Sequence, residues 1–210
     1  MYLVNTYIKP SSIEGKGFFA KEFIPKGVIV YFYGDSDRFY SKGEFQSLAD
    51  KEKELLFKYG VEDEFGNWNM TETGLDAIEA NHSCDANILS LFADGIYCDI
   101  AVKDIQEDEE ITIDYGMFYS SYSWQMKCNC KSSICRKVAG SGISIDSKTK
   151  DLWYSRINEA VKHISEVNQP LFSLENDKAR MLTRAIKGKL NQRVFSYTKF
   201  ALISRDNNGA

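Results

Sequence analysis

The sequence has 210 residues, of which 43% are hydrophobic and 27% are charged. A chain of this length can bury one substantial core and still carry an appendage, and its composition is typical of a soluble globular protein. No run approaches the roughly 18 apolar residues that a membrane span needs. The first ten residues, MYLVNTYIKP, lack the basic region and the long apolar core of a signal peptide. We therefore expect an intracellular protein.

The formal net charge of −4 is distributed unevenly along the chain. Residues 1–146 carry 14 Lys and Arg against 24 Asp and Glu, whereas residues 147–210 carry 12 against 6. An acidic face would attract a peptide rich in Lys and Arg and would repel nucleic acid. A charged surface that only keeps the protein in solution explains the same numbers equally well.

Three segments rich in β-branched and aromatic residues predict strands, because each is closed by Gly or by charged residues. They are residues 27–34 (GVIVYFYG), 95–102 (GIYCDIAV) and 109–116 (EEITIDYG). Residues 41–60 predict one helix, which Gly60 would end. Its rough apolar stripe consists of Phe45, Leu48, Leu55 and Leu56.

The end of the chain predicts a linker at residues 141–150 and then two amphipathic helices separated by Pro170. The apolar positions of the helices are Trp153, Ile157, Ala160, Val161 and Ile164, followed by Leu174, Met181, Leu182, Ala185 and Ile186. These basic helices could bind an acidic partner, nucleic acid, a second copy of the chain, or the acidic first part of the same chain. We favour the last.

The five cysteines favour a metal site over a disulfide framework, because their number is odd and three of them cluster in CNCKSSIC. Cys128, Cys130 and Cys135 supply three soft ligands, and a structural zinc site needs four. Cys84 is the leading candidate for the fourth, since Cys98 lies within a predicted strand and resembles a small buried hydrophobic residue. Three unrelated thiols or a redox pair are the alternatives.

Several motifs occur in a fixed order along the chain. They are Gly15-Lys16-Gly17, KGVIVYFYGD, NHSCDAN, EEITIDYG and Cys-x-Cys-x4-Cys. In this order they resemble the SET-domain protein lysine methyltransferases that carry a post-SET zinc motif. The resemblance spans about residues 8–138 and implies a SET domain at 1–118, a post-SET zinc-binding segment at 119–140, a linker at 141–150 and a helical C-terminal extension at 151–210.

The fold that this resemblance implies is mainly β, with several small sheets and a C-terminal pair of α-helices. The Asn-His-Ser-Cys segment and the strand that ends in Tyr115 would meet in a knot-like crossing. Such threading is rare and cannot be deduced from a sequence pattern.

The activity that the resemblance implies is methyl transfer from S-adenosylmethionine to a lysine side chain, which would enter a narrow channel from the opposite face. The implied cofactor-binding residues are Gly15, Lys16, Gly17, Asn81, His82 and Tyr115. Zinc would be held by Cys84, Cys128, Cys130 and Cys135. Tyr115 matches the catalytic tyrosine, and Tyr33 matches a second tyrosine of the lysine channel, although Tyr31 is close enough to leave that register open.

Residue chemistry is consistent with this activity, because methyl transfer to an amine depends mainly on positioning. A free lysine has a pKa near 10.4, and an apolar channel that disfavours the charged form would help to unmask the amine. Aromatic walls suit that purpose and also attract a methylated ammonium. Without the motifs, either tyrosine could simply pack on a strand, and His82 could be a hydrogen-bonded structural histidine.

The sequence departs from the family pattern at several positions. Ile78 and Glu79 stand where many members have Arg-Phe, and Ala86 replaces the usual proline. Ile113 occupies a place, two residues before Tyr115, where an aromatic side chain often helps to set the number of methyl groups. The smaller side chain favours multiple methylation.

The substrate is expected to be a lysine-containing protein, with a histone tail as the commonest target of the family and ribosomal or other lysine-rich proteins as alternatives. A histone substrate would place the protein in the nucleus or on chromatin. The competing function is a non-catalytic SET-like module that binds a lysine-containing peptide. A redox-active metal protein fits poorly, because four thiolates leave no open position on zinc.

Overall fold

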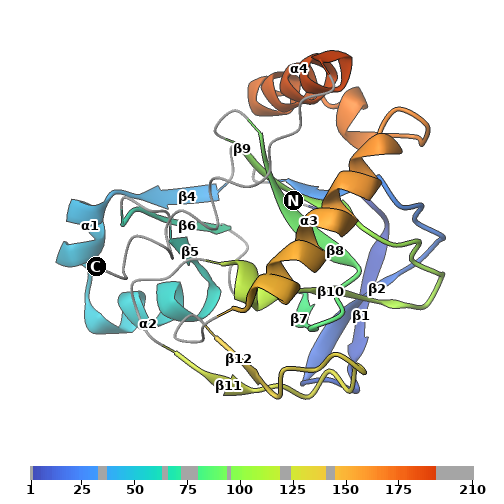
Figure 1. Ribbon diagram of the computed structural model, residues 1–210. Helices are drawn as coiled ribbons and strands as arrows, with labels where there is room; N and C mark the ends of the chain where they lie inside the picture. Colours follow the sequence, from blue (N-terminus) through green and yellow to red (C-terminus); the bar gives the residue numbers. More distant parts are fainter. Residues whose placement is uncertain are drawn as a thin grey trace.

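The computed structural model describes residues 2–32, 37–62, 66–71, 80–93, 96–118, 124–140 and 145–192. Over these residues the chain is mainly β and forms one seven-stranded sheet and two smaller sheets, with two longer helices near its C-terminal end (Figure 1). The mainly β architecture and the pair of C-terminal helices are as expected from the sequence. No helix in the described part of the chain is both long and apolar enough to cross a membrane.

The largest sheet has the strand order β1-β2-β10-β8-β9-β3, and β7 pairs with β10 beside this path. Its strands β1 and β2 form an antiparallel pair, whereas β10 runs parallel to both β7 and β8. The strands are β1 (Thr6–Pro10), β2 (Lys16–Ala20), β3 (Ile29–Phe32), β7 (Asn81–His82), β8 (Ile88–Ala93), β9 (Ile96–Ala101) and β10 (Glu110–Ile113).

Both faces of the sheet are buried around strands β3 and β8, which explains why these strands are nearly continuous apolar runs. Ile88 packs in the cluster on one face, and Leu89 packs in the cluster on the other, as the two-residue period of a strand requires. In β3, Ile29 and Phe32 belong to the same cluster although their spacing is odd. A shift of register between Ile29 and Tyr31 accounts for this, because a bulge inserts one extra residue.

The two longer helices are α3 (Ser147–Lys162) and α4 (Asp177–Gln192), joined through the short helix η2 (Pro170–Ser173). In Figure 1, α3 crosses β8 and β9, and its apolar residues share one buried cluster with Leu89, Leu91 and Ile100 of those strands. The basic helix therefore packs against the first part of its own chain. Of the apolar positions predicted for the second helix, Met181 is instead 54% exposed.

Polar contacts hold α3 and the following turn in place. Arg156 donates to Asp85 at 2.6 Å, and Asp85 also pairs with Lys103 at 2.8 Å. The buried Gln169 accepts from the backbone of Ile29 at 3.0 Å and donates to the carbonyl of Gly27 at 2.7 Å. These contacts tie the C-terminal turn to strand β3.

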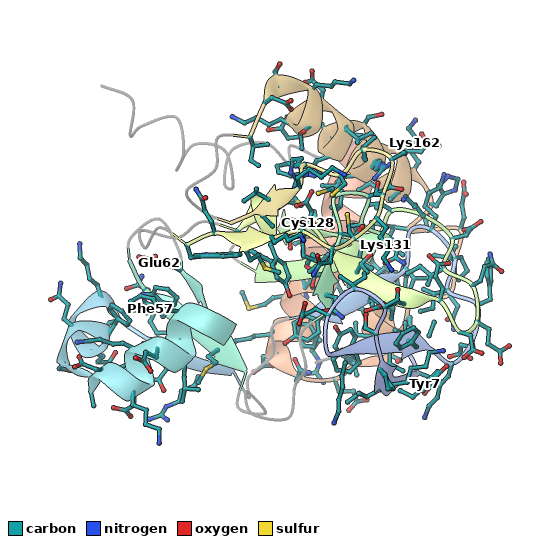
Figure 2. The ribbon with its side chains drawn as sticks, turned by 90° about the horizontal axis from the view of Figure 1, so that it is seen from below. Tyr7, Phe57, Glu62, Cys128, Lys131 and Lys162 are labelled. Carbon is teal, nitrogen blue, oxygen red and sulfur yellow. The ribbon has the colours of Figure 1, made fainter. Side chains whose placement is uncertain are left out.

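A second, smaller part of the molecule lies between β3 and β7. It contains the sheet β4-β6-β5 and two short helices, and Phe57 and Glu62 mark it in Figure 2. Its own core comprises Tyr40, Leu56 and Trp68 with the half-buried Phe45 and Phe57. The elements are β4 (Asp37–Tyr40), α1 (Lys42–Ser47), α2 (Asp50–Tyr59), β5 (Val61–Glu62) and β6 (Trp68–Thr71).

The prediction of one helix over residues 41–60 is wrong, since the chain forms α1 and α2 with an extended break at Leu48 and Ala49. Each helix has its own start. Glu44 accepts from the backbone of Ser41 at 2.8 Å, and Glu52 accepts from the backbone of Ala49 at 3.2 Å. A glutamate three residues into a helix that binds back in this way is a strong start signal.

The three predicted strands are confirmed at their centres by β3, β9 and β10, but their ends differ. The strand predicted over 109–116 stops at Ile113, because Asp114 turns the chain and accepts from the backbone of Gly116, at the start of the short helix η1 (Tyr115–Met117). At the C-terminal end, α3 begins at Ser147, inside the predicted linker. The remaining elements, β11 (Met126–Lys127) and β12 (Val138–Ala139), pair with each other.

Asp99 is a buried carboxylate within the main sheet. It is 5% exposed, and it accepts from the hydroxyl of Ser90 on the neighbouring strand at 2.7 Å. Burial raises the pKa of Asp99 to about 6 from the ordinary value of 3.8. The folded protein therefore binds this proton more tightly than the unfolded chain does.

We predict that Asp99→Asn becomes increasingly stabilising, relative to the natural sequence, as the pH rises through 4 to 7. A raised pKa in the folded state gives stability that is fully present below the unfolded pKa and is lost above the folded one. The difference should reach about 3 kcal/mol near neutral pH. Thermal unfolding at several pH values measures it, with the exposed Asp151→Asn as control. If the difference in stability between Asp99→Asn and the natural protein does not vary with pH, the raised pKa of Asp99 is contradicted.

Candidate active site

The Asn-His-Ser-Cys segment and the strand before Tyr115 lie side by side. Asn81 and His82 pair in parallel with Thr112 and Ile113, and the backbone of Ser83 donates to the carbonyl of Ile113 at 3.0 Å. The close approach of these two segments is therefore present in the structure. The threading of a knot-like crossing stays a prediction.

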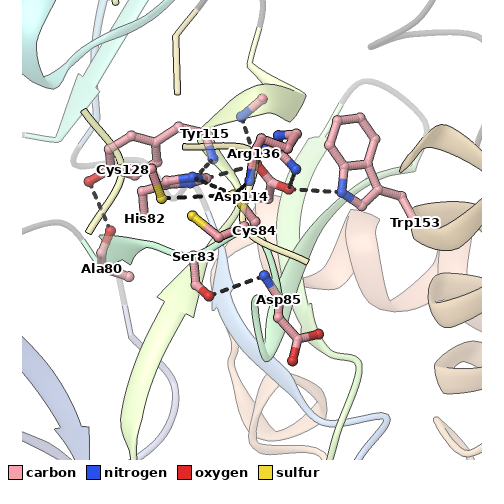
Figure 3. Close-up of polar contacts among 12 residues, drawn as sticks. Ala80, His82, Ser83, Cys84, Asp85, Asp114, Tyr115, Cys128, Arg136 and Trp153 are labelled. Atoms are coloured by element: carbon pink, nitrogen blue, oxygen red, sulfur yellow. Dashed lines mark hydrogen bonds and ion pairs between the residues drawn. The ribbon is translucent and has the colours of Figure 1, made fainter. Parts of the chain in front are cut away.

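Tyr115 lies two residues after the end of strand β10 (Figure 3) and is half-buried. Its hydroxyl donates to the carbonyl of Ala80 at 3.0 Å, and its backbone nitrogen donates to Nδ1 of His82 at 3.1 Å. The tyrosine ring lies 5.3 Å from the His82 ring, 6.2 Å from Trp124 and 6.3 Å from Phe118. The tyrosine is thus held at both ends and surrounded by other rings.

His82 is 2% exposed, and burial lowers the pKa of its imidazole, although the nearby Asp114 carboxylate opposes that effect. The ring is therefore neutral at neutral pH. Because Nδ1 accepts the Tyr115 N–H, the single ring proton resides on Nε2. This nitrogen lies 3.4 Å from the sulfur of Cys84, to which it can donate.

Asn81 joins the glycine-rich turn to the same place. Its side-chain nitrogen donates to the carbonyls of Glu14 and Lys16, each at 3.1 Å, and to Oε1 of Glu110 at 2.7 Å. Two of the segments predicted to bind a cofactor, residues 15–17 and 81–82, are therefore adjacent. Gly15 has a φ of +48°, a conformation that glycine adopts without strain.

Gly17 is the second residue of strand β2, and its missing side chain makes room for Glu110. A methyl group there would collide with Oε1 of Glu110, would lie 2.8 Å from its Cδ atom and would lie 3.1 Å from the Asn81 side-chain nitrogen. Glu110 also accepts from Ser11 at 2.8 Å. The glycine thus allows one carboxylate to join the turn, strand β10 and Asn81.

Four cysteine sulfurs come together beside this site. Those of Cys84, Cys128, Cys130 and Cys135 all lie within 4.8 Å of one another, and the sulfurs of Cys84 and Cys128 are 3.8 Å apart. A tetrahedral zinc with Zn–S bonds of about 2.3 Å places its sulfurs about 3.8 Å apart. The residues therefore fit this metal. Cys98 is fully buried in the main core, as predicted for a small hydrophobic residue.

The loop from Cys128 to Cys135 is shaped by its backbone. The nitrogen of Cys128 donates to the carbonyl of Lys137 at 2.9 Å, and strands β11 and β12 bring the two ends of the loop together. Burial raises the pKa of Cys84 to about 11, whereas backbone N–H groups aimed at Cys130 outweigh burial and lower the pKa of that thiol to about 7. Metal binding at these thiols must therefore release protons.

Asp114 lies at the centre of this region and is completely buried. The Arg136 guanidinium donates to both carboxylate oxygens, at 2.8 and 2.5 Å, and the indole nitrogen of Trp153 donates at 3.0 Å. Sequence reasoning missed this set of residues. The available signal was that Asp114 directly precedes Tyr115 and that Arg136 directly follows Cys135. Trp153 also fits the apolar stripe predicted for its helix, which gives no hint of its polar contact.

The structure leaves several of the positions singled out in the sequence untested. Tyr33 lies outside the described residues, as do Ile78 and Glu79. Tyr31 is half-buried and packs edge-on against Tyr2 with ring centroids 5.1 Å apart, so the choice between Tyr31 and Tyr33 stays a prediction.

Ala86 and Ile113 are buried, in two different core clusters. Ala86 therefore contributes a small apolar side chain to one core cluster, and Ile113 packs from strand β10 into the other.

Comparison with known proteins gives a family match for the segment that carries Gly17, Asn81, His82 and Tyr115. Residues 15–116 match the sequence model of the "SET domain" family. The Plasmodium falciparum protein named "Putative histone-lysine N-methyltransferase 1" is 29% identical over 138 residues, which cover 61% of this chain and 2% of that protein. "Histone-lysine N-methyltransferase 2D" of Homo sapiens and of Mus musculus is 25% identical over 138 residues, 63% of this chain and 2% of theirs.

The chain thus spans about 2% of the length of these curated relatives. Among solved structures, a crystal structure of a Plasmodium falciparum "putative histone methyltransferase" aligns at 23% identity and a TM-score of 0.39, covering 54% of this chain and 94% of that one. Residues 15–116 of this chain are therefore similar in sequence to the SET domain family.

Proposed function

We propose that this protein is an S-adenosylmethionine-dependent protein-lysine N-methyltransferase that acts on a basic protein such as a histone tail. The SET domain and the names of its relatives support this class of activity. The observation that carries the proposal is the position of Tyr115, whose hydroxyl lies 3.0 Å from the Ala80 carbonyl beside Asn81 and His82. A histone substrate would place the protein on chromatin.

The cofactor would be held by residues 15–17 together with Asn81, His82 and Tyr115. The hydrogen bonds from Asn81 to the carbonyls of Glu14 and Lys16 support this site, because they join the two binding segments. When bound, S-adenosylmethionine supplies an electrophilic methyl group on a positively charged sulfur. The neutral, buried His82 would not repel that charge.

The lysine substrate must lose a proton before its nitrogen can attack. The rings of Tyr115, Phe118 and Trp124 provide apolar surface that disfavours the ammonium, and they attract a methylated product through cation–π interaction. Because the Tyr115 hydroxyl donates to Ala80, its lone pairs can accept from an amine N–H. The hydroxyl would then direct the nitrogen lone pair toward the methyl carbon, and the N–C bond would form as the C–S bond breaks.

Tyr33 would line the same channel, as the sequence motif predicts. Cys84, Cys128, Cys130 and Cys135 would bind a structural zinc, since four thiolates close the coordination shell and leave no open position for catalysis. In this proposal the SET domain extends over residues 1–118 and the zinc-binding segment over 119–140.

A non-catalytic module that binds a lysine-containing peptide is the second candidate. It would need the fold and the zinc but not an oriented tyrosine hydroxyl. The two hydrogen bonds that hold Tyr115 favour the enzyme.

We predict that Tyr115→Phe lowers methyl transfer by about 100-fold or more, because the amine loses the group that orients it. Radiolabelled methyl transfer to histones, ribosomal proteins and total lysate measures the effect, and calorimetry confirms that the variant binds cofactor. Tyr7→Phe, which removes a hydroxyl bound to Asp108 at the surface, is the matched control. Unchanged transfer in Tyr115→Phe would refute the catalytic role, and cofactor binding by the natural protein without transfer would favour the binding module.

We predict that Gly17→Ala weakens cofactor binding and lowers stability by about 1–3 kcal/mol, because the new methyl group displaces Glu110 from Asn81. In a Glu110→Ala background the same substitution should cost much less. Calorimetry and thermal unfolding measure both effects. Gly43→Ala in helix α1, where a Cβ meets no atom within 4 Å, should be neutral or stabilising. Equal losses in both backgrounds would rule out the collision with Glu110.

We predict that purified protein contains tightly bound zinc and that Cys84→Ser or Cys130→Ser loses most of it. Removing one thiolate from a closed tetrahedral site opens the site, and the protein should then unfold at a lower temperature. Atomic absorption and thermal unfolding with and without chelator measure this. Cys98→Ala, a buried cysteine outside the cluster, should keep its zinc. Zinc that depends on Cys98 and not on Cys84 would overturn the assignment.

A further inference from the structure

Two chains of contacts join Tyr115 to the cysteine cluster. In the first, the backbone N–H of Tyr115 donates to Nδ1 of His82 at 3.1 Å, and Nε2 of the same ring lies 3.4 Å from the sulfur of Cys84. A single rigid imidazole therefore lies between Tyr115 and a predicted zinc ligand.

The second chain reaches the same sulfur from the other side. Asp114, the residue before Tyr115, accepts two hydrogen bonds from the Arg136 guanidinium, and the backbone N–H of Arg136 donates to the Cys84 sulfur at 3.3 Å. The two chains together form a closed ring of contacts consisting of Tyr115, His82, Cys84, Arg136 and Asp114 (Figure 3).

Trp153 contacts this ring from helix α3. Its side chain is 4% exposed, and its indole N–H donates to Oδ2 of Asp114 at 3.0 Å. The Arg136 guanidinium carbon lies 5.9 Å from the centre of the Trp153 ring. The indole therefore supports both the acid and the base of the buried ion pair, from a helix that lies outside the matched SET domain.

The Asp114 carboxylate controls the backbone at Tyr115. It also accepts from the N–H of Gly116 at 2.9 Å, which begins the turn that contains the tyrosine. A buried carboxylate that loses one donor must reorient or admit water. Because Asp114 and Tyr115 are consecutive, such a reorientation would alter the N–H that Tyr115 directs at His82.

We propose that Trp153 is a positioning residue for Tyr115. Helix α3 holds Asp114 through the indole N–H, and Asp114 sets the orientation of Tyr115 relative to His82 and Cys84. The consequence for catalysis rests on the proposed methyltransferase function, whereas the structural coupling does not. The C-terminal helices thereby become part of the active-site support.

The structural coupling is tested by the backbone amide signal of Tyr115 in protein labelled with ¹⁵N-tyrosine. The signal of Tyr115 is assigned as the one that disappears from the spectrum of the Tyr115→Phe variant. In Trp153→Phe, which removes the indole N–H and keeps an aromatic ring, the Tyr115 amide should shift by more than that of Tyr40 in the separate small sheet. Ile157→Val, a buried change on the same helix, should leave the Tyr115 amide in place.

A second variant keeps the test decisive if Trp153→Phe does not fold. Benzothienylalanine at position 153 retains the shape of the bicyclic ring and replaces only its N–H by sulfur. It should shift the same amide signal. A Tyr115 amide that moves no more than that of Tyr40 in the folded variants would overturn the proposal.

The functional consequence is tested by kinetics with a lysine-containing peptide. Both variants at position 153 should lower kcat by about 10- to 100-fold. The missing indole N–H is remote from the substrate, but its loss would misalign Tyr115. The KM for peptide and the affinity for S-adenosylmethionine should stay within about twofold of the natural values. The reason is that the variants keep the contacts that bind both molecules equally in the ground state and in the transition state. Ile157→Val should keep its kcat.

A change in KM alone, or an unchanged kcat with the indole N–H removed, would overturn the positioning role. If the natural protein transfers methyl to no substrate, the proposed function fails while the amide shift still decides the coupling. The two failures are therefore distinguishable.

Discussion

The buried Asp114 carboxylate is the interaction on which the rest of the site depends. A fully buried negative charge is costly unless it is paired and hydrogen-bonded. Its donors come from three parts of the chain: the turn at Gly116, the cysteine loop through Arg136, and helix α3 through Trp153. All three parts must therefore be in place before the carboxylate can be buried at low cost. The same requirement fixes the backbone beside Tyr115.

The packing of the core has the same consequence for the C-terminal helices. Strands β8 and β9 bury one face against Trp153, Ile157 and neighbouring residues of α3, so the helices complete a core that the strands begin. The Arg156–Asp85 ion pair adds a charged contact between the basic helix and the acidic first part of the chain. At this position, the opposite charges of the two parts of the chain therefore meet in a contact inside the protein. Helix α3 cannot be removed without exposing apolar surface of the sheet.

Local sequence signals predicted some elements well. They failed where tertiary contacts or side-chain caps determine the ends of a helix or the register of a strand. The apolar spacing from Trp153 to Ile164 correctly predicted the buried face of α3. The apolar stripe over residues 41–60 suggested one helix, but Glu52 binds back to Ala49 and starts a second. In β3, the bulge between Ile29 and Tyr31 shifts the alternation by one residue, which a simple two-residue pattern does not reveal. Strand β2 is absent from the predicted elements, because two glycines flank Lys16 and glycine is unfavourable in strands. Gly17 is needed there for the close approach of Glu110.

The order of the motifs, the grouping of the cysteines and the amphipathic character of the final helices can all be read from the sequence. Each of these depends on spacing over a few residues or on motif order, which can be read without coordinates. The meeting of Asp114, Arg136 and Trp153 depends on the folded chain, since Trp153 is 39 residues from Asp114 along the sequence. A hydrogen bond between such distant residues leaves no periodic or local signature. It exists because the fold brings β10, the cysteine loop and α3 to one buried point.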